Sequence, residues 1–288
     1  MPAASQTIAP TAPIPISTST PIPTPTALAK INFAVIGDYG DANQQLPAVA
    51  EMVLGWTPDF IVTLGDNNYP KGDSATIDTN IGKFFHAYIW PYSGEYGTGA
   101  DTIRFFPVLG NHDWNTQKAQ PYLDYFELPN NERYYDFEWG FLHFFMLDSD
   151  SREPDGIGTS SLQAKWLEEK LDTSTAPWKI VVLHHPPYSS GEREANLAVR
   201  WPFEAWGADI VFAGHEHFYE RLVVNEFPYI INGLGGGPRY AFGEIHPGSQ
   251  KRFRAQNGAL MVQATQKNLT VQFFTITGVE IDTFELNK

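Results

Sequence analysis

Short apolar runs that end at a glycine or a polar residue recur along the chain from Lys30 onward. They occupy residues 31–36, 59–64, 104–109, 142–147, 178–183 and 208–213. Their length and their content of Val, Ile, Leu and Phe are typical of buried β-strands. The pattern therefore predicts a sheet whose strands are short and hidden from solvent.

Other segments have the pattern of helices or of half-exposed strands. Residues 44–55 and 161–171 are expected to be helices, and Leu162, Trp166 and Leu167 are expected to form the apolar face of the second. Residues 258–285 alternate polar and apolar positions, as antiparallel strands do. Together these elements predict one α/β domain over residues 30–288.

The first 29 residues have a different composition, dominated by Pro, Thr, Ser and Ala. Such a segment cannot bury an apolar core, so we expect a disordered or polyproline-like stretch. It is either a free tail or a linker to an additional module, and Pro/Thr linkers of this kind are frequent in exported proteins. No basic region followed by an apolar core is present, so no signal peptide is expected in this chain.

Composition narrows the possible chemistry. The formal net charge is −14, and no basic stripe offsets it, so binding to a nucleic-acid polymer is not expected. No run reaches the ~18 apolar residues of a membrane-spanning helix. With no cysteine, any metal site must use oxygen and imidazole ligands. Such ligands suit iron, zinc, manganese or magnesium better than copper(I) or an iron–sulfur cluster.

Oxygen and imidazole ligands follow five of the predicted strands. Their motifs are Gly-Asp-Tyr-Gly, Gly-Asp-Asn-Asn-Tyr, Gly-Asn-His-Asp, Val-Val-Leu-His and Gly-His-Glu-His. Each motif alone also has a simpler explanation, which is a turn for the first three and a core or surface histidine for the last two. The carboxyl ends of strands in an α/β sheet lie at one edge, so their polar residues are expected to meet there. His215 and His217 also have the spacing of metal ligands on an extended segment. The candidate ligands are Asp38, Asp66, Tyr69, Asn111, His184, His215 and His217.

In this order, the motifs resemble those of the purple acid phosphatases, a group within the calcineurin-like metallophosphoesterase superfamily. The resemblance runs through most of residues 32–275 and includes segments between the motifs, such as 133–137 and 144–149. It implies a four-layer α/β/β/α sandwich formed by a single catalytic domain over residues 30–288.

The resemblance also implies how the ligands are shared between two metal ions. Asp38, Tyr69 and His217 would bind one ion, and Asn111, His184 and His215 the other, while Asp66 would bridge them. A phenolate from Tyr69 favours Fe(III), and the second set suits Fe(II), Zn(II) or Mn(II). Many members of the superfamily have His at the position of Gly40. Its absence here, together with Tyr69, favours the purple acid phosphatase branch over the cyclic-nucleotide diesterases.

The implied reaction is hydrolysis of a phosphate ester by in-line attack of a metal-bound hydroxide. His112 and Asp66 are the expected catalytic residues, and the expected substrate contacts are Asn111, His112, Arg193 and Arg239. Relatives usually carry a second substrate-side His where this chain has Arg193. An arginine can bind phosphate but cannot donate a proton near neutral pH. His185 is expected to point away from His184. Asp148 and Asp150 are expected to be loop caps, with support of the metal ligands as the alternative.

Three functions are compatible with these motifs. The first is a phosphomonoesterase that acts outside the cytoplasm, in the periplasm, at the cell surface or after secretion. The second is a phosphodiesterase or nucleotidase that uses the same site, with the aromatic segment 84–101 shaping a pocket for a base or a lipid head group. The third is a non-catalytic surface module, which the presence of all seven candidate ligands disfavours.

Overall fold

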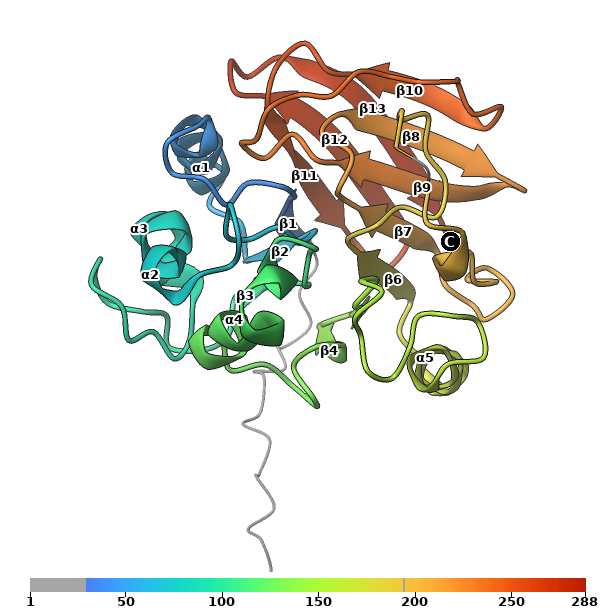
Figure 1. The fold of residues 1–288 in the computed structure, drawn as a ribbon. Coiled ribbons are helices and arrows are strands. Elements are labelled where there is room, and N and C mark those ends of the chain that lie inside the picture. Colours follow the sequence, from blue (N-terminus) through green and yellow to red (C-terminus); the bar gives the residue numbers. More distant parts are fainter. Residues whose placement is uncertain (1–29, 194) are drawn as a thin grey trace, which may run out of the picture.

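The computed structural model describes residues 30–193 and 195–288. The prediction of a disordered tail or linker for residues 1–29 lies outside these ranges. The described residues form two mixed β-sheets that pack against each other (Figure 1).

The two sheets differ in how their strands are ordered. From edge to edge, the first contains β13 (Glu280–Asn287), β12 (Asn268–Thr275), β11 (Gly258–Ala264), β1 (Ile31–Ile36), β2 (Phe60–Thr63) and β3 (Phe105–Phe106). The second contains β10 (Ser249–Phe253), β8 (Tyr219–Val224), β9 (Phe227–Asn232), β7 (Ile210–Ala213), β6 (Trp178–Leu183), β5 (Leu142–Met146) and β4 (Tyr135–Trp139).

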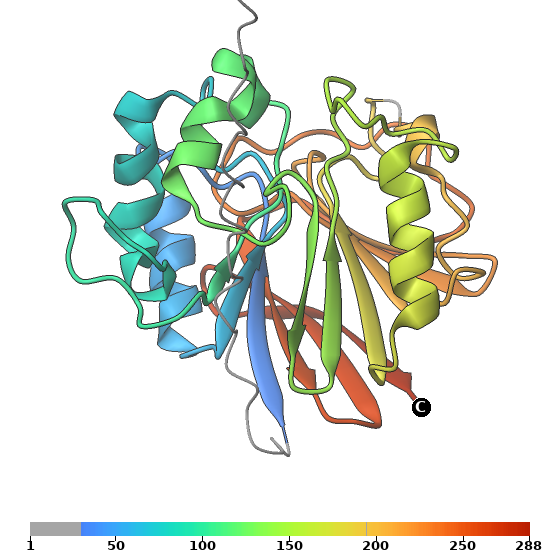
Figure 2. The ribbon, with the colours of Figure 1, turned by 90° about the horizontal axis from the view of Figure 1, so that it is seen from below.

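Helices cover the outer faces of both sheets (Figure 2). Those beside the first sheet are α1 (Leu46–Gly55), α2 (Ser74–Ile77), α3 (Lys83–Phe85) and α4 (Gln120–Tyr125). The second sheet is covered by α5 (Leu162–Thr173). Shorter 3₁₀ or π segments are η1 (Asp78–Gly82), η2 (His86–Tyr88), η3 (Asp113–Asn115), η4 (Gln117–Ala119) and η5 (Leu197–Val199). The layers follow the order α/β/β/α, as the family resemblance implied.

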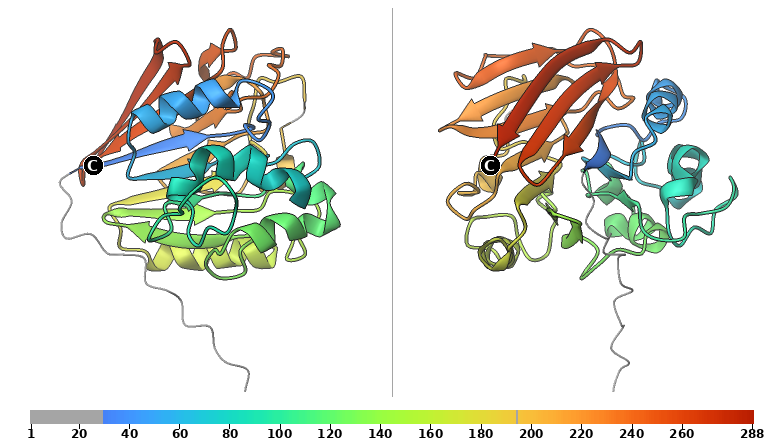
Figure 3. Two further views of the ribbon diagram at one scale, coloured as in Figure 1. Left: turned by 90° about the vertical axis from the view of Figure 1, so that its left-hand side faces the viewer. Right: turned by 180° about the vertical axis from the view of Figure 1, so that it is seen from behind.

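The six predicted strands are all present, but they do not form one sheet. β1, β2 and β3 run parallel in the first sheet, whereas β5, β6 and β7 run parallel in the second. The expectation of a single sheet from the apolar runs is therefore wrong. The run at 104–109 pairs only over Phe105 and Phe106, because Pro107 next in the chain cannot donate a ladder hydrogen bond. The C-terminal strands are antiparallel as predicted, and β11 pairs with β1 (Figure 3).

Aromatic side chains fill the space between the sheets. Phe106 of the first sheet stacks on Phe137 of the second, with ring centroids 3.6 Å apart. Phe60 contacts Phe144 edge to face at 5.5 Å. Interiors this dense resist sliding of one layer over the other. This packing therefore fixes the relative position of the strand ends that carry the candidate ligands.

The helix α5 is placed as predicted, with a different buried face. The Ser161 hydroxyl accepts a hydrogen bond from the Ala164 amide at the N-terminus, which is a common helix cap. Leu167 and Leu171 are buried against the second sheet, whereas Leu162 is 63% exposed. Leu162, the first residue of the helix, is thus exposed to solvent, and its assignment to the apolar face was wrong.

The helices of the described ranges are all too short or too polar to span a lipid bilayer.

Candidate metal centre

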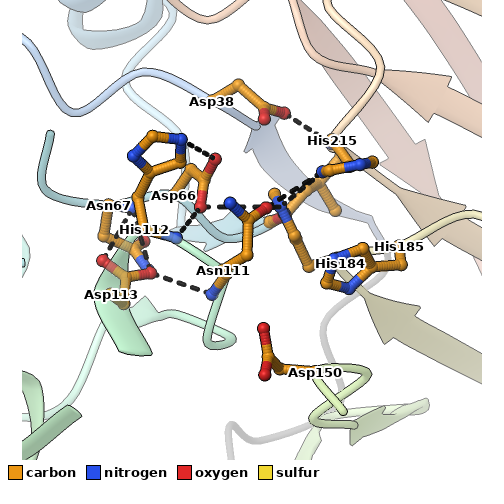
Figure 4. Close-up of polar contacts among 12 residues, drawn as sticks. Asp38, Asp66, Asn67, Asn111, His112, Asp113, Asp150, His184, His185 and His215 are labelled. Carbon is orange, nitrogen blue, oxygen red and sulfur yellow. Dashed lines mark hydrogen bonds and ion pairs between the residues drawn. The ribbon is translucent and has the colours of Figure 1, made fainter. Parts of the chain in front are cut away.

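All seven candidate ligands meet where the two sheets come together. Asp38 follows β1, Asp66 and Tyr69 follow β2, and Asn111 lies after β3. His184 follows β6, and the segment after β7 carries His215 and His217. The two sheets thus contribute ligands from facing strand ends (Figure 4).

The first cluster contains Asp38, Tyr69 and His217. The Tyr69 hydroxyl lies 3.5 Å from Oδ1 of Asp38 and 3.2 Å from Nε2 of His217. The same Nε2 is 3.3 Å from Oδ1 of Asp38. A phenol oxygen, a carboxylate oxygen and an imidazole nitrogen therefore surround one point.

The second cluster contains Asn111, His184 and His215. Oδ1 of Asn111 is 3.1 Å from Nε2 of His184 and 3.0 Å from Nδ1 of His215. The two ring nitrogens are 3.3 Å apart. An amide oxygen and two imidazole nitrogens that face one another are a suitable donor set for a divalent cation.

Asp66 joins the two clusters. Its Oδ2 accepts a hydrogen bond from the Tyr69 hydroxyl at 2.9 Å, while its Oδ1 lies 3.5 Å from Nε2 of His184. Oδ1 also accepts a hydrogen bond from the backbone amide of His112 at 2.8 Å. One carboxylate oxygen thus faces each cluster.

The backbone is strained at three of the candidate ligands. Asp38, Asp66 and His215 have φ angles of 55°, 52° and 67°. This left-handed region costs a non-glycine residue about 1–3 kcal/mol, and such residues concentrate at functional sites. Gly65, just before Asp66, has a φ of 86°, and a Cβ there would lie 2.5 Å from the His184 ring. The loops are therefore shaped to bring these side chains together.

Carbonyl oxygens fix the direction of two of the imidazole rings. Nδ1 of His184 is bonded to the Leu64 carbonyl at 2.7 Å, and Nδ1 of His217 is bonded to the Pro238 carbonyl. Each ring thereby presents Nε2 to the centre. A hydrogen bond from the outer nitrogen of this kind is the usual way to orient a metal-binding histidine.

The charges of the centre fit bound cations. Asp38 and Asp66 are buried, and in the described parts of the chain neither pairs with Lys or Arg. Burial and then the negative charge of Asp66 raise the pKa of Tyr69 well above its usual value. A cation in the site would offset these effects and favour the phenolate. The residues present thus fit two metal ions, as the resemblance implied.

Gly40 occupies the position where many superfamily members have a histidine. A Cβ on Gly40 would lie 2.1 Å from the carbonyl oxygen of Asn67. No side chain can enter there without moving this loop, so the first cluster must use Tyr69 in place of that histidine.

His112 lies at the rim of the centre. Its ring is 4.5 Å from that of Tyr69, its Nε2 is 3.9 Å from Oδ2 of Asp66, and the side chain is 31% exposed. Nδ1 is bonded to the Pro70 carbonyl at 2.7 Å. The exposed Nε2 can therefore reach a molecule bound at the centre.

His185 is not turned away from the site, contrary to the prediction. Its ring lies 4.8 Å from the His184 ring and 4.5 Å from the His215 ring. The Ser149 hydroxyl holds Nδ1 of His185 at 3.0 Å and also accepts a hydrogen bond from its amide. β6 ends at Leu183, so His184 and His185 do not alternate as they would in a strand. Burial, and then the charge of His184, lower the pKa of His185 to about 3.

The two arginines predicted to contact substrate differ in their neighbours. Arg193 is exposed and stacks over Tyr240 at 4.3 Å, and Tyr240 stacks on His217 at 3.9 Å. The Arg239 side chain instead donates to Oδ1 of Asn257. Within the described ranges, Arg239 makes no hydrogen bond to a candidate ligand.

Two supporting residues were not predicted from the sequence. Arg152 donates to the carbonyl oxygen of Asn111 at 2.8 Å and is held by both carboxylate oxygens of Asp150. Asp150 is therefore more than a loop cap. Asp113 accepts hydrogen bonds from Gly110 and from the backbone and side chain of Asn67. The polar density of the Gly-Asn-His-Asp motif was a signal for Asp113, whereas Arg152 lies in a segment without a motif.

Comparisons with known proteins agree with this geometry. Purple acid phosphatase 17 of Arabidopsis thaliana is 25% identical over 289 residues, covering 86% of this chain and 82% of that protein. The Fe(3+)-Zn(2+) purple acid phosphatase 12 of the same plant is 29% identical over 227 residues, covering 70% of this chain and 46% of that protein. The chain spans less than half the length of several curated relatives that it matches.

A purple acid phosphatase from yellow lupin (Lupinus luteus) seeds has a similar structure. The TM-score is 0.71 at 18% identity, over 92% of this chain and 55% of that one. This similarity confirms the fold. The family model of the calcineurin-like phosphoesterases matches residues 31–219. The chain therefore belongs to the calcineurin-like phosphoesterase family, with purple acid phosphatases among its relatives.

Proposed function

We propose that this protein is a binuclear-metal phosphomonoesterase of the purple acid phosphatase type. The observation that carries the proposal is the position of Asp66, with one carboxylate oxygen facing each cluster of candidate ligands. A site for a single cation would need only one of these clusters.

The proposed cofactors are Fe(III) in the first cluster and Fe(II), Zn(II) or Mn(II) in the second. Tyr69 supports a hard trivalent ion, because a phenolate between carboxylates needs a strongly charged partner. The relative named as an Fe(3+)-Zn(2+) enzyme supports a mixed pair. When bound, the two ions supply charge stabilisation for the phosphoryl group and lower the pKa of a coordinated water.

The protein side chains position the ester and its leaving group. Asn111 and Asp66 hold their orientation through hydrogen bonds with Arg152 and with the His112 amide. His112, whose Nε2 is exposed at the rim, is the proposed donor to a phosphate oxygen or to the leaving group. Arg193 lies outside Tyr240 and is the proposed second contact. Because a guanidinium keeps its protons, Arg193 can only bind and orient the phosphate.

The diesterase and nucleotidase alternatives depended on the aromatic segment 84–101. In the structure, Tyr92 donates to the carboxylate of Asp78, which also accepts from Tyr125 and from the Glu95 amide. The described side-chain hydrogen bonds of this segment reach Thr79, Asp78, Thr98, Tyr92 and Pro58, and none of them involves a candidate ligand. No observation favours a diester over a monoester.

The location and partners of the protein are further parts of the proposal. A site of this kind accepts small phosphate esters, and the net charge of −14 disfavours a nucleic-acid polymer. The Pro/Thr-rich composition of residues 1–29 supports extracytoplasmic action and a link to an additional module. Detection of the native protein in culture medium or in a periplasmic or surface fraction would test this location.

The activity is tested with an aryl phosphate monoester and the matching diester. The purified protein is assayed as isolated, after treatment with chelator, and after re-addition of Fe, Zn or Mn. A metal-dependent preference for the monoester is expected. Preference for the diester would instead establish the second function. Absence of hydrolysis in every metal state would support the third, a surface module.

A further inference from the structure

A pocket rich in arginine lies beside the metal centre. It has a volume of about 580 Å³ and is lined by Arg239, Phe242, Arg252, Phe253, Arg254 and Ala255. We call it the arginine pocket. Three guanidinium groups around one hollow are unusual in a chain whose formal net charge is −14.

Among the described residues, these three arginines form no ion pair with a carboxylate. In residues 30–193 and 195–288, the arginine ion pairs are those of Arg133, Arg152 and Arg221. Like charges gathered without a counter-charge repel one another. An anion in the pocket would relieve this repulsion.

Most of the hydrogen-bond donors in the arginine pocket are unused. Arg239 donates to Oδ1 of Asn257, Arg252 to Oγ of Ser249, and Arg254 to the Tyr240 carbonyl. Those are the only hydrogen bonds that their guanidinium groups make within the described ranges, whereas a guanidinium carries five N–H groups. Because these donors lie in a planar fork, they match the oxygens of a phosphate.

Neighbouring groups hold the arginines in place without forming a direct ion pair in the described ranges. The Phe242 ring lies 5.9 Å from the guanidinium carbon of Arg252 and 5.8 Å from that of Arg254. The buried carboxylate of Glu220 lies behind Ser249 and accepts hydrogen bonds from Ser249 and Ser190. Arg252 lies opposite Glu220 in the pairing of β10 with β8, and the Ser249 hydroxyl accepts a hydrogen bond from Arg252 and donates one to Glu220.

Tyr240 connects the arginine pocket to the metal centre. Its ring stacks on that of the candidate ligand His217, with centroids 3.9 Å apart, and its carbonyl accepts the hydrogen bond from Arg254. Its amide donates to the His217 carbonyl at 3.1 Å. One residue therefore separates the two sites, and the loop that holds His217 also forms a wall of the pocket.

We propose that the arginine pocket binds a second phosphoryl group of the substrate. The preferred substrates would then carry two or more phosphoryl groups, one at the metal centre and one between the arginines. The proposal rests on the proposed phosphatase function. For inorganic tripolyphosphate, one water adds across the terminal P–O–P bond. The products near neutral pH are orthophosphate, pyrophosphate and one proton.

The kinetic test compares inorganic tripolyphosphate with an aryl phosphate that has a single phosphoryl group. In the double variant Arg252→Gln/Arg254→Gln, KM for tripolyphosphate is expected to rise at least tenfold while kcat changes less than twofold. Both parameters for the aryl phosphate should stay within twofold of the wild type. The variant Arg239→Gln, which leaves β10 unchanged, should show a smaller rise in the same KM.

A control removes the same amount of charge elsewhere. Lys165 and Lys267 are exposed and make no ion pair within the described ranges, so Lys165→Ala/Lys267→Ala should leave both substrates unchanged. An equal loss for tripolyphosphate in this control would show a general effect of charge and overturn the proposal. So would an unchanged KM in both arginine variants.

A binding measurement separates failure of the pocket from failure of the phosphatase function. Calorimetric titration of metal-free protein with tripolyphosphate should show one site in the wild type and at least tenfold weaker binding in the double arginine variant. If tripolyphosphate binds but no metal state of the protein hydrolyses it or the aryl phosphate, the proposed pocket stands and the proposed phosphatase function is wrong. If orthophosphate binds the pocket as tightly as tripolyphosphate does, the pocket is a site for free phosphate. The proposal of a substrate subsite would then be wrong. Absence of binding would overturn the pocket even if the enzyme is active.

Discussion

The candidate metal centre and the arginine pocket have opposite charges and are separated by Tyr240. The centre gathers two buried carboxylates that have no Lys or Arg partner, whereas the pocket gathers three arginines without a carboxylate, both within the described ranges. Three of the candidate ligands in the centre have strained backbone. The residues that line the pocket instead lie in the loop before β10, in β10 itself and directly after it. The difference supports the proposals that cations complete the centre and that an anion occupies the pocket.

The largest expected effect comes from breaking the centre. His215→Ala or Asp66→Ala should lower kcat for an aryl phosphate by about a thousandfold or more, because the charge stabilisation of the phosphoryl group is lost. Circular dichroism should show an intact fold, and tripolyphosphate should still bind the arginine pocket. Full activity in either variant would show that these residues are not ligands.

Asp113 offers a test of the negative charge in the metal-free centre. Burial, and then the charge of Asp66, raise the pKa of Asp113 from 3.8 to about 7. Its stabilising contribution is therefore fully present below about pH 4 and is lost as pH rises towards 7, at a cost of up to about 4 kcal/mol. Asn at this position cannot ionise.

Urea unfolding of metal-free wild type and Asp113→Asn between pH 4 and pH 8 measures this effect. The difference in the free energy of unfolding should shift in favour of the variant as pH rises. A difference that does not change with pH would mean that Asp113 ionises normally beside Asp66. The double arginine variant should keep the pH dependence of the wild type, since the pocket is a separate charge cluster.

Metal removal should lower thermal stability. At a metal concentration about a hundred times the dissociation constant, binding contributes about 2.7 kcal/mol, which corresponds to a fall in Tm of about 5–10 °C on chelation. Differential scanning calorimetry with and without metal measures this fall. The same fall is expected in the double arginine variant, whereas an unchanged Tm in the wild type would argue against a preformed metal site.

The smallest expected effect concerns Arg152, which positions Asn111 through a hydrogen bond to its carbonyl oxygen. Arg152→Gln should lower kcat about tenfold for tripolyphosphate and aryl phosphate alike, as is usual when a group that orients a ligand is lost. KM should change little, and metal affinity should fall. A rise in KM for tripolyphosphate alone would place Arg152 with the pocket and not with the centre.

The sequence predicted the metal centre far better than the arginine pocket. The candidate ligands Asp38, Asp66 and His184 come shortly after the ends of apolar strands, so local pattern and the rule that strand ends share an edge locate them. The pairing of sheets is non-local. The apolar runs do not show whether their strands form one sheet or two. Only the family resemblance implied that there is a second sheet.

Other features depend on side-chain directions that the periodicity of apolar and polar residues does not predict. His185 lies beside His215 because the chain leaves β6 before it, which the alternation of a strand does not predict. Arg252 and Arg254 have the spacing of one face of a strand, which is common on solvated strands. Their relation to Arg239 and Tyr240 follows from the packing of a loop against β10, and hence from tertiary structure.

The binuclear centre is tested most directly by the number of metal ions bound per chain. Elemental analysis of protein reconstituted with iron and zinc should give two ions per chain for the wild type. It should give one ion or fewer for Asp66→Asn, because Asp66 has an oxygen facing each cluster. A wild-type chain that binds a single ion, or an Asp66→Asn variant that keeps two, would contradict the binuclear centre.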